Sequence, residues 1–499
     1  MAISNPGGNL NSVAAPQAVT LASNYIDFTH ADTAGWAQQY LPDLMDKEAE
    51  VFGPRTISGF LSQVGAEESM TSDQVIWSEQ GRLHLSYTGT VVHDTSVVTI
   101  LADIDGNVDA GGFDPTDHGI RLNDQVLVSV AEGTYKGICT AHSGDTVTIA
   151  PYGAEHMDDL AAFTAGATSA CTVLVYGSEF NKGVGGQGTY GGVSASGPKT
   201  VTPKFKSFTN KPIIMKDFYE ISGSDVSQIG WVEIAGEEGQ NGYLWYLKAE
   251  GDTRARFTDY MEMAMLEAEK IVATSVAVDT VFSGGAGLGT NAGTEGLFAA
   301  ITDRGNVTTG VTGVNAATDL AEFDAILAEF DSQGAIEENM MFVNRATSLA
   351  MDDMLASMNS YGAGGTSYGV FNNEEDMALN LGFSGFRRGS YDFYKSDMRY
   401  LNDKATRGGI NSRDAVGAIR GVMVPAGTSS VYDQQLGKNL KRPFLHVRYR
   451  ASQTDNRKFK TWVTGSVGAA TSDLDAMQIN YLSERCLVVQ GANNFMLMK

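Results

Sequence analysis

The sequence predicts an α+β fold that carries a small all-β domain inserted at a loop. Three observations support this prediction. A long helical pattern follows an extended, lysine-bearing stretch, short β-rich runs fill 88–200, and the chain returns to strands over 415–499. At 499 residues the chain is too long for one hydrophobic core, so we expect two or three compact units.

The helical pattern lies at 254–276, which contains no Gly or Pro and consists largely of strong helix formers. Gly251, Asp252 and Thr253 precede it and supply candidate N-caps. An apolar stripe predicts that the helix lies across a sheet, with Glu262 on another part of its surface. The stripe consists of Phe257, Met261, Ala264, Ala268, Ile271 and Ser275.

The stretch ahead of the helix, from about 204 to 230, is typical of strand and extended loop. Aromatic and aliphatic residues alternate with lysines there. We expect this ribbon to need partners outside its own subunit, because it cannot pair all of its apolar and basic groups alone. Residues 1–32 are poor in large apolar groups and predict a terminal arm, and 35–64 predicts a helix interrupted at Pro42.

Five short β-rich runs lie between Thr88 and Thr200, and Gly, Asp, Asn and Ser turns separate them. This spacing predicts a small antiparallel barrel or sandwich. A glycine- and serine-rich segment at 182–200 follows the last run and predicts a flexible exit from an inserted domain.

Beyond the long helix, 295–302 predicts a strand, and an amphipathic helix with Phe323 and Phe330 on its apolar face is expected to end at Gly334. A strand at 340–343 follows, and Asn344 is a candidate N-cap for the next helix. We expect loops over 361–409. Strands are predicted at 418–425, 444–451, 458–467 and 486–490.

Charge and composition disfavour several classes of protein. The formal net charge is −24, from 35 basic and 59 acidic residues, which disfavours free-standing nucleic-acid binding. No Lys or Arg precedes Lys47, and no run reaches the roughly 18 apolar residues of a membrane helix, so we expect neither a secretory signal nor a membrane span. The expected location is a cytoplasm. Cys139, Cys171 and Cys486 form no C-x-x-C pair and are expected as buried free thiols.

Candidate cofactor motifs fail in their contexts. Residues 183–188 satisfy G-x-G-x-x-G, but the sequence that follows cannot form the helix that a dinucleotide site requires. Asp103, Asp105, Asn107 and Asp109 resemble a calcium loop with a displaced glycine, which makes them a weak metal candidate beside the favoured interpretation, a solvated acidic turn. The seven histidines show no zinc spacing. No cofactor and no catalytic motif is expected.

The order of extended ribbon, long helix and mixed α/β domain resembles the major capsid proteins of tailed phages, which have the Hong Kong 97 type fold. Residues 71–87, TSDQVIWSEQGRLHLSY, and the YLPDLMDKEAEVFG stretch near Tyr40 look similar to the crAss-like phage group. The resemblance implies an N-terminal arm, an extended loop, a spine helix, and peripheral and axial domains. The implied division is 1–70 arm, 71–87 first strand of the extended loop, 88–200 insertion, 201–240 return strand, 241–315 peripheral domain, 316–430 axial domain and 431–499 completing strands.

The resemblance implies a structural role rather than an enzymatic one: a virion shell subunit assembled in the host cytoplasm as pentamers and hexamers. Scaffolding, portal and auxiliary capsid proteins are the expected partners, and the shell would enclose double-stranded DNA without sequence-specific or membrane binding. An encapsulin-like compartment and a β-rich adhesion protein remain alternatives. The expected inter-subunit contacts are Phe205, Phe208, Lys211, Lys216, Phe218, Tyr219, Lys441, Arg442, Arg457 and Lys458. Acidic residues of a neighbour, such as Glu233, Glu237 and Glu238, are the expected partners of the basic tract 438–460.

Overall fold

The structure is a computed structural model that describes residues 60–61, 66–80, 86–104, 114–180, 205–224, 233–235, 241–271, 293–359, 385–413, 417–426, 428–433, 438–467 and 470–499. Only the backbone is described at 66, 80, 117, 205–206, 233–235, 241–248, 356–359, 428–433 and 438–442. The chain divides into two compact units, 1–75 with 209–499, and 76–208, each described here by itself.

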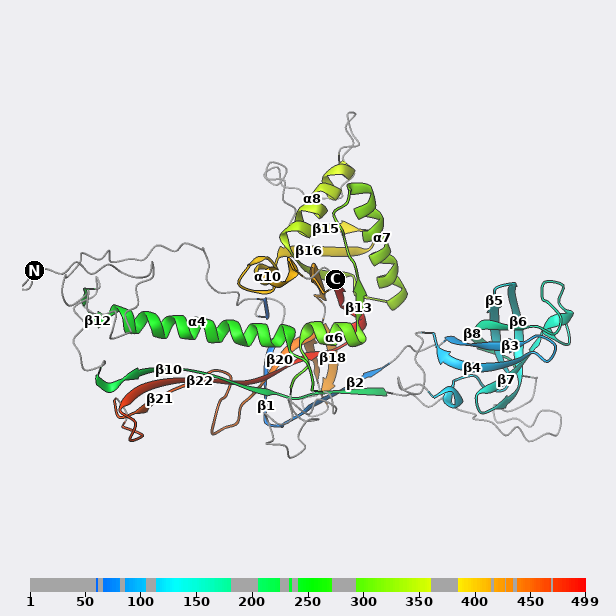
Figure 1. Cartoon of the computed structure of the whole chain (residues 1–499). Coiled ribbons are helices and arrows are strands. Elements are labelled where there is room, and N and C mark those ends of the chain that lie inside the picture. The colour runs from blue at the N-terminus through cyan, green and yellow to red at the C-terminus, as the bar shows by residue number, and fades with distance from the viewer. Residues whose placement is uncertain are drawn as a thin grey trace, which may run out of the picture. The chain divides into compact units, whose positions relative to one another are not determined.

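A five-stranded sheet forms one layer of the larger unit (Figure 1). β1 runs parallel to β20, whereas β20, β10 and β21 all pair antiparallel with the long strand β22. The strands are β1 (Ala66–Met70), β20 (Leu445–Arg450), β22 (Ala476–Val489), β10 (Ile213–Ser222) and β21 (Lys460–Gly465). The expected strands near 444–451, 458–467 and 486–490 are therefore present, and the last is longer than the sequence indicates.

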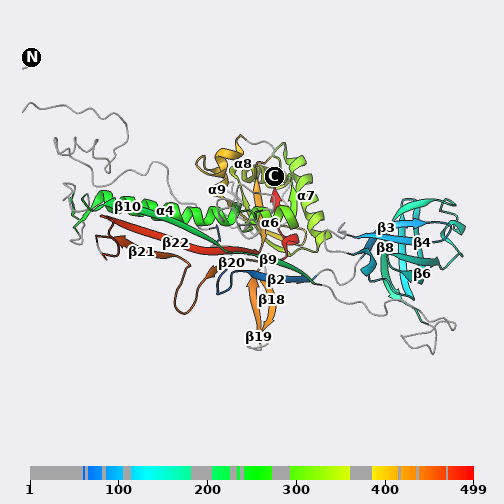
Figure 2. The same ribbon diagram turned by 60° about the horizontal axis from the view of Figure 1, so that its bottom comes forward.

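Helix α4 (Leu244–Glu267) lies along one face of this sheet (Figures 1 and 2). Phe257 and Met261 of the predicted stripe are buried against Ile479 and Tyr481 of β22. The predicted bounds, 254–276, were wrong, because the helix begins ten residues earlier, at Leu244, and ends at Glu267. Its interior therefore includes the residues expected as N-caps, 251–253, and the Thr253 hydroxyl donates to the Ala249 carbonyl at 2.9 Å.

Two further parts of the stripe prediction need correction. Ala264 is only half-buried, and Ala268 and Ile271 lie beyond the end of the helix, while Ser275 is outside the described residues. Glu262, expected on the surface, is 9% exposed, and its carboxylate accepts a hydrogen bond from the Leu61 amide at 3.0 Å. The buried face of α4 includes Met265 and Leu266 instead.

A six-stranded mixed sheet forms the second part of the larger unit. Both faces of its central strands are covered, so that Met341, Phe342 and Val343 are all buried. Helices α7 (Ala316–Gln333) and α8 (Arg345–Asn359) supply the core on one face. The strand order is β13 (Asn306–Thr308), β23 (Met496–Met498), β17 (Gly421–Pro425), β14 (Glu338–Val343), β16 (Tyr391–Asp397) and β15 (Gly385–Arg388).

Sequence signals predicted the helix ends in this part correctly, but not the element at 295–302 or the strands within 361–409. Gly334 ends α7 at φ 64° as predicted, and Asn344 caps α8, its side-chain oxygen accepting from the Thr347 amide at 2.8 Å. The strand expected at 295–302 is instead helix α6 (Leu297–Arg304), whose apolar face joins the core beneath the second face of the sheet. The expected loop 361–409 contains β15 and β16.

Short elements complete the larger unit. Two-stranded pairs link β11 with β12 and β18 with β19, and short helices α9 and α10 follow β16. Among the described helices, none combines the length and apolar character needed to span a membrane. The short elements are β11 (Glu233–Ala235), β12 (Asn241–Tyr243), β18 (Thr428–Asp433), β19 (Lys438–Pro443), α9 (Arg399–Asn402), α10 (Arg407–Asn411) and the 3-10 turn η4 (Ala492–Asn494).

The smaller unit contains a closed six-stranded antiparallel barrel. Alternate side chains fill its interior, and Val91, Val126 and Val173 have no exposed surface. Gly89 sits at a register shift where an added Cβ would lie 2.1 Å from the Thr99 carbonyl oxygen. In barrel order the strands are β3 (Ser86–Val92), β4 (Val97–Asp103), β7 (Thr146–Pro151), β6 (Gly133–Ser143), β5 (Asp124–Val130) and β8 (Thr168–Ser178), with 3-10 turns η2 (Pro115–Asp117) and η3 (Met157–Asp159).

A two-stranded ribbon of β2 (Val75–Gln80) and β9 (Phe205–Asn210) adjoins the barrel in the sequence. Trp77 is 7% exposed and lies against Phe208, with ring centroids 6.1 Å apart. The glycine-rich segment 182–200 and the N-terminal stretch 1–59 lie outside the described residues.

Candidate assembly surface

The candidate surface is the face of the five-stranded sheet that α4 does not cover. Side chains of β10 alternate between the two faces, as a strand requires. Ile213 and Met215 pack on the α4 side, whereas Ile214 and Phe218 are each 55% exposed on the other. We call this second face the open face.

Register places the residues of the open face in rows across three strands. Phe218 lies opposite Asn480 of β22, which in turn lies opposite Trp462 of β21. The next row contains Lys216, Leu482 and Lys460 in the same order. The open face therefore exposes Phe218 and Ile214 beside Lys216, whereas Leu482 in the second row is buried.

Two expected contact residues, Phe218 and Tyr219, lie on opposite faces. Tyr219 is half-buried on the α4 side, and this burial raises the pKa of its phenol. An in-register strand alternates its side chains, so Phe218 faces away from α4 and Tyr219 faces toward it. Contact of either residue with a neighbour remains a prediction. The backbone of β10 pairs along its whole length with β22 of the same chain, and contact of its outward side chains with a neighbour remains a prediction.

The remaining residues expected at inter-subunit contacts lie in different elements and are not brought together. Phe208 packs on Trp77 in the smaller unit. Lys211 follows β9, and its amide donates to the Asn210 side chain at 2.9 Å. The side chains of Phe205, Lys441 and Arg442 are outside the described residues, although their backbones lie in β9 and β19.

Basic side chains around β20 and β21 find acidic partners within the chain. The Arg457 guanidinium contacts Glu484 at 2.8 Å, and Lys458 pairs with Glu67 and lies over the Tyr449 ring, 5.4 Å from its centroid. The further pairs are Arg448 with Glu68, Arg450 with Asp73 and Glu484, Arg485 with Glu67, and Lys460 with Asp455. Arg457 and Lys458 therefore have partners within the chain, and their pairing with a neighbour remains a prediction. The side chain of Glu233 and residues Glu237 and Glu238 lie outside the described residues.

This charge cluster stabilises the junction of β1, β20 and β22. Arg485 is 8% exposed, and its burial lowers the pKa of the guanidinium, whereas the negative charges of Glu67 and Glu262 raise it. Arg485 also donates to the Ser483 hydroxyl and the Lys458 carbonyl, each at 2.9 Å. A buried cation of this kind needs several acceptors. The cluster therefore fixes the strand order rather than offering free charge.

Asn210, which sequence reasoning missed, anchors the end of β9. It is 1% exposed, and its amide nitrogen donates to the Leu487 carbonyl at 2.6 Å and the Glu295 carbonyl at 3.0 Å. Its amide oxygen accepts from the Glu295 amide at 2.9 Å and the Thr294 hydroxyl at 3.1 Å. A lone Asn in a polar stretch gives no sequence signal for such a role.

Candidate metal ligands are not brought together in the described part of the chain. Asp103 ends β4 and is 9% exposed, but Asp105, Asn107 and Asp109 lie outside the described residues. Among the residues that are described, no group of three or more His, Cys, Asp or Glu could hold a metal ion. The three cysteines are buried and free, as expected, and burial raises the pKa of the Cys139 and Cys486 thiols to about 12.

Comparisons with known proteins give structural neighbours only, because neither a family model nor a curated protein matches the chain. A chain from the capsid of cyanophage P-SCSP1u is 8% identical, with a TM-score of 0.36 over 95% of this chain and 98% of that one. A chain from the capsid of the native GTA particle is 11% identical, with a TM-score of 0.34 over 94% and 98%. A chain of Microbacterium phage Oxtober96 is 7% identical, with a TM-score of 0.34 over 93% and 99%. Because these scores are below 0.5, the proposal below rests on this chain's own residues.

Proposed function

We propose that this chain is a structural subunit that self-assembles into the icosahedral capsid of a tailed phage, with a Hong Kong 97 type fold. The observation that carries the proposal is the open face: a long sheet, braced on one side by a 24-residue helix, exposes Ile214 and Phe218 on the other, with Lys216 between them. Large exposed apolar side chains beside a charged group mark a candidate interaction site. A subunit whose sheet is rigid on one side and open on the other suits repeated association with copies of itself.

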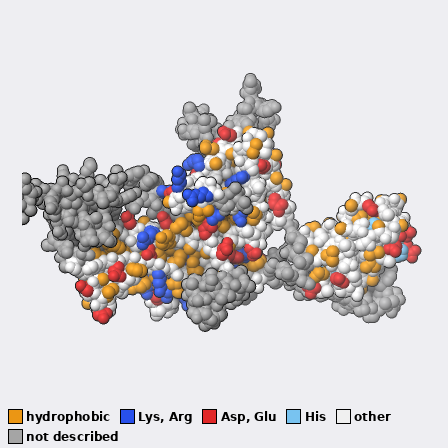
Figure 3. Space-filling model, in the orientation of Figure 1, with side chains coloured by type: hydrophobic (Ala, Val, Ile, Leu, Met, Phe, Trp, Pro, Cys, Tyr) orange, Lys and Arg blue, Asp and Glu red, His pale blue; other side chains and the backbone are white. Residues whose placement is uncertain are grey.

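Apolar surface also follows the long helix. Figure 3 shows hydrophobic side chains gathered over α4 and the neighbouring sheet, with basic groups in separate clusters. Tyr260 of α4 is 47% exposed, and Met263 and Ala264 are half-buried. These residues add a second apolar strip to the proposed contact area. Pentamers and hexamers are the assemblies to which we assign these surfaces.

The barrel is assigned to a domain inserted in the extended loop. Residues 86–180 contain 13 acidic and 2 basic residues, a formal net charge of −11. A unit this acidic is repelled by the phosphates of DNA. We therefore place it on the outside of the shell, where it decorates the surface or braces subunits, while the shell encloses double-stranded DNA without sequence-specific contacts. Scaffolding, portal and auxiliary proteins and assembly in the host cytoplasm belong to the same proposal.

Electron microscopy of the expressed chain, alone and with its genomic neighbours, tests the proposal. We expect closed shells of uniform diameter. Phe218→Ser should leave a folded subunit, because the side chain is 55% exposed, but should reduce the yield of shells severalfold. Tyr176→Ser, which removes an aromatic side chain 47% exposed on the barrel, is the matched control, and it should assemble normally if the barrel only decorates the shell. A discrete monomer or trimer under all conditions would contradict the proposal and favour an adhesion protein.

Removal of the barrel tests its assignment as an insertion. Residues 86–180 expressed alone should give a soluble β protein that unfolds cooperatively, because the barrel has its own closed core. The complementary deletion, closed with a Gly/Ser linker, should retain the helical circular-dichroism signal. Shells from the deletion variant indicate decoration, and a folded variant that cannot close shells indicates bracing. A disordered fragment would contradict the assignment.

A further inference from the structure

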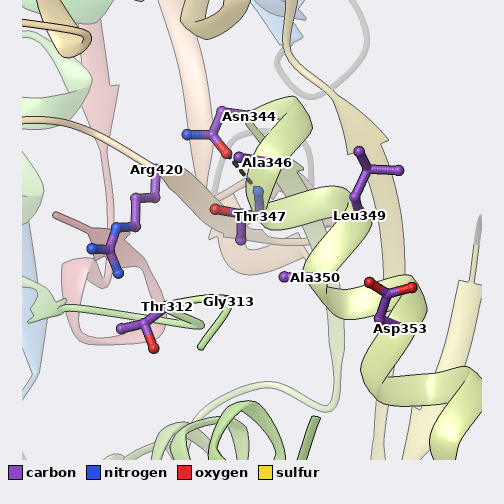
Figure 4. Close-up of a pocket in the computed structure, with 9 residues that line it drawn as sticks. All are labelled: Thr312, Gly313, Asn344, Ala346, Thr347, Leu349, Ala350, Asp353 and Arg420. Atoms are coloured by element: carbon purple, nitrogen blue, oxygen red, sulfur yellow. Dashed lines mark hydrogen bonds between the residues drawn. The ribbon is translucent and has the colours of Figure 1, made fainter. Parts of the chain in front are cut away.

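A pocket of about 310 Å³ opens at the N-terminus of α8, in the larger unit (Figure 4). Its wall combines that N-terminus with the loop at Thr312 and Gly313 and with Arg420. The loop is held in place from behind, because Glu322 accepts hydrogen bonds from the Thr312 amide and hydroxyl at 2.7–2.9 Å and Asp319 accepts from the Gly313 amide at 2.8 Å. The pocket is thus a built feature of the fold.

Hydrogen-bond donors gather at the helix end of the pocket. Asn344 accepts from the Thr347 amide, and the Arg345 amide donates to the Asn402 side chain at 2.7 Å, which leaves the Ala346 amide without an acceptor among the described residues. Thr347 is only 4% exposed and lines the pocket, and no described residue shares a hydrogen bond with its hydroxyl. Figure 4 shows this hydroxyl directed toward the side where Arg420 and Thr312 lie. A hydroxyl that opens onto a pocket and has no partner in the described chain is available to bind a ligand.

Arg420 places positive charge on the same side of the pocket. Its backbone is fixed on both sides, since its carbonyl accepts from the Asn344 amide at 2.7 Å and its amide donates to the Met498 carbonyl at 2.8 Å. Its guanidinium donates once, to the Thr309 carbonyl at 2.9 Å, and forms no ion pair with any described residue. The cation therefore retains donors that the fold does not use.

Acidic groups near the pocket oppose an anion. Glu322 and Asp319 keep their negative charges, although their carboxylates are directed at the amides and hydroxyl of the loop. Asp353 lines the pocket and is exposed, but it lies about 12 Å along the helix axis from Arg345, beyond the first turn. The helix dipole adds partial positive charge at the end where the donors gather.

From this geometry we propose that the pocket binds an oxyanion, held by the Arg420 guanidinium, the Thr347 hydroxyl and the Ala346 amide. A planar guanidinium beside a helix N-terminus suits a phosphate or carboxylate group. The same chemistry has two sources, free inorganic phosphate and a carboxylate on a second copy of this chain, which carries 59 acidic residues. The site does not depend on the proposed function.

Calorimetric titration of the unassembled full-length chain with inorganic phosphate, and separately with acetate, tests the site. We expect saturable binding of one anion per chain. Arg420→Gln and Thr347→Val should each weaken it about tenfold or more, because each removes a donor, the first of them charged. Thr347→Val preserves the buried volume and removes no internal hydrogen bond, so the loss can be separated from misfolding. Asp353→Asn should strengthen binding modestly. Arg387→Gln, which also removes one positive charge from an arginine 63% exposed, is the matched control and should change nothing.

A second measurement distinguishes the two sources. If the natural ligand is a carboxylate of a second copy, phosphate at saturating concentration should slow self-association of the wild type but not of Thr347→Val. If the natural ligand is free phosphate, association should not fall while binding persists. The proposal is overturned if phosphate and acetate fail to bind saturably, or if Arg420→Gln and Thr347→Val bind as the wild type does.

Discussion

Phe257→Ala should weaken the packing of α4 on the five-stranded sheet and so lower the free energy of unfolding. Phe257 is 1% exposed, and its ring centroid lies 6.0 Å from that of Tyr481 and 5.6 Å from that of Phe459. Phe→Ala changes in well-packed cores cost about 3–5 kcal/mol in the free energy of unfolding, and the rigid sheet beneath favours the upper part of that range. A loss of this size is a large share of the stability of a typical domain.

Urea denaturation of unassembled subunits, followed by far-ultraviolet circular dichroism, measures the effect. The chain has two compact units, so we expect two transitions, and only the transition that includes the helical signal should move. Tyr260→Ala is the matched control, because Tyr260 is on the same helix but 47% exposed, and it should cost less than about 1 kcal/mol. Equal midpoints for Phe257→Ala and the wild type would refute the packing of α4 on this sheet.

Three further predictions concern charge and protonation. Glu484→Gln should destabilise the larger unit by about 3 kcal/mol, measured by the same denaturation, because Glu484 is 7% exposed and its loss leaves Arg457 and Arg450 without their shared carboxylate. Met265→Asp should yield little soluble protein, since Met265 has no exposed surface, whereas Ala264→Asp, on the half-buried part of the helix, should remain soluble in a fractionation assay. Burial raises the pKa of the barrel thiols Cys139 and Cys171 from 9.0 to about 12 and about 11. The stability that these neutral thiols contribute is therefore complete below pH 9 and is lost as the pH rises toward 12. The thermal midpoint of the barrel should fall above pH 9, and it should fall less in Cys139→Ala.

Local signals in the sequence predicted those elements whose ends are set by one residue. Gly334 in the left-handed region and the Asn344 side chain act within their own turn, so their roles could be read without knowing the fold. The start of α4 could not, because Gly251 and Asp252 look like a cap, yet the helix continues through them from β12. Tertiary packing along the sheet outweighs the weak helix propensity of these two residues.

Contacts between distant segments were beyond sequence reasoning. The Arg450 and Asp73 pair joins residues 377 positions apart, and the bond from the Leu61 amide to Glu262 spans 201. A basic tract in an acidic chain predicts ion pairing, but it does not say whether the acids lie in the same subunit. The strand predicted at 295–302, where α6 lies, was wrong for another reason, since a short apolar run has no periodicity that separates helix from strand.

Adjacent residues of β10 serve different purposes, one in the packing of the subunit and the other in the proposed assembly. Phe218 faces outward and Tyr219 faces α4, so a slip of one residue in the pairing with β22 would exchange them. Ten residue pairs fix that register, and Asn210, bonded to the Leu487 carbonyl, fixes the chain just before the strand begins. The open face is consequently as well defined as the core behind it. A change at Phe218 should therefore alter association without altering stability, whereas a change at Tyr219 should alter both, and the two can be measured on the same strand.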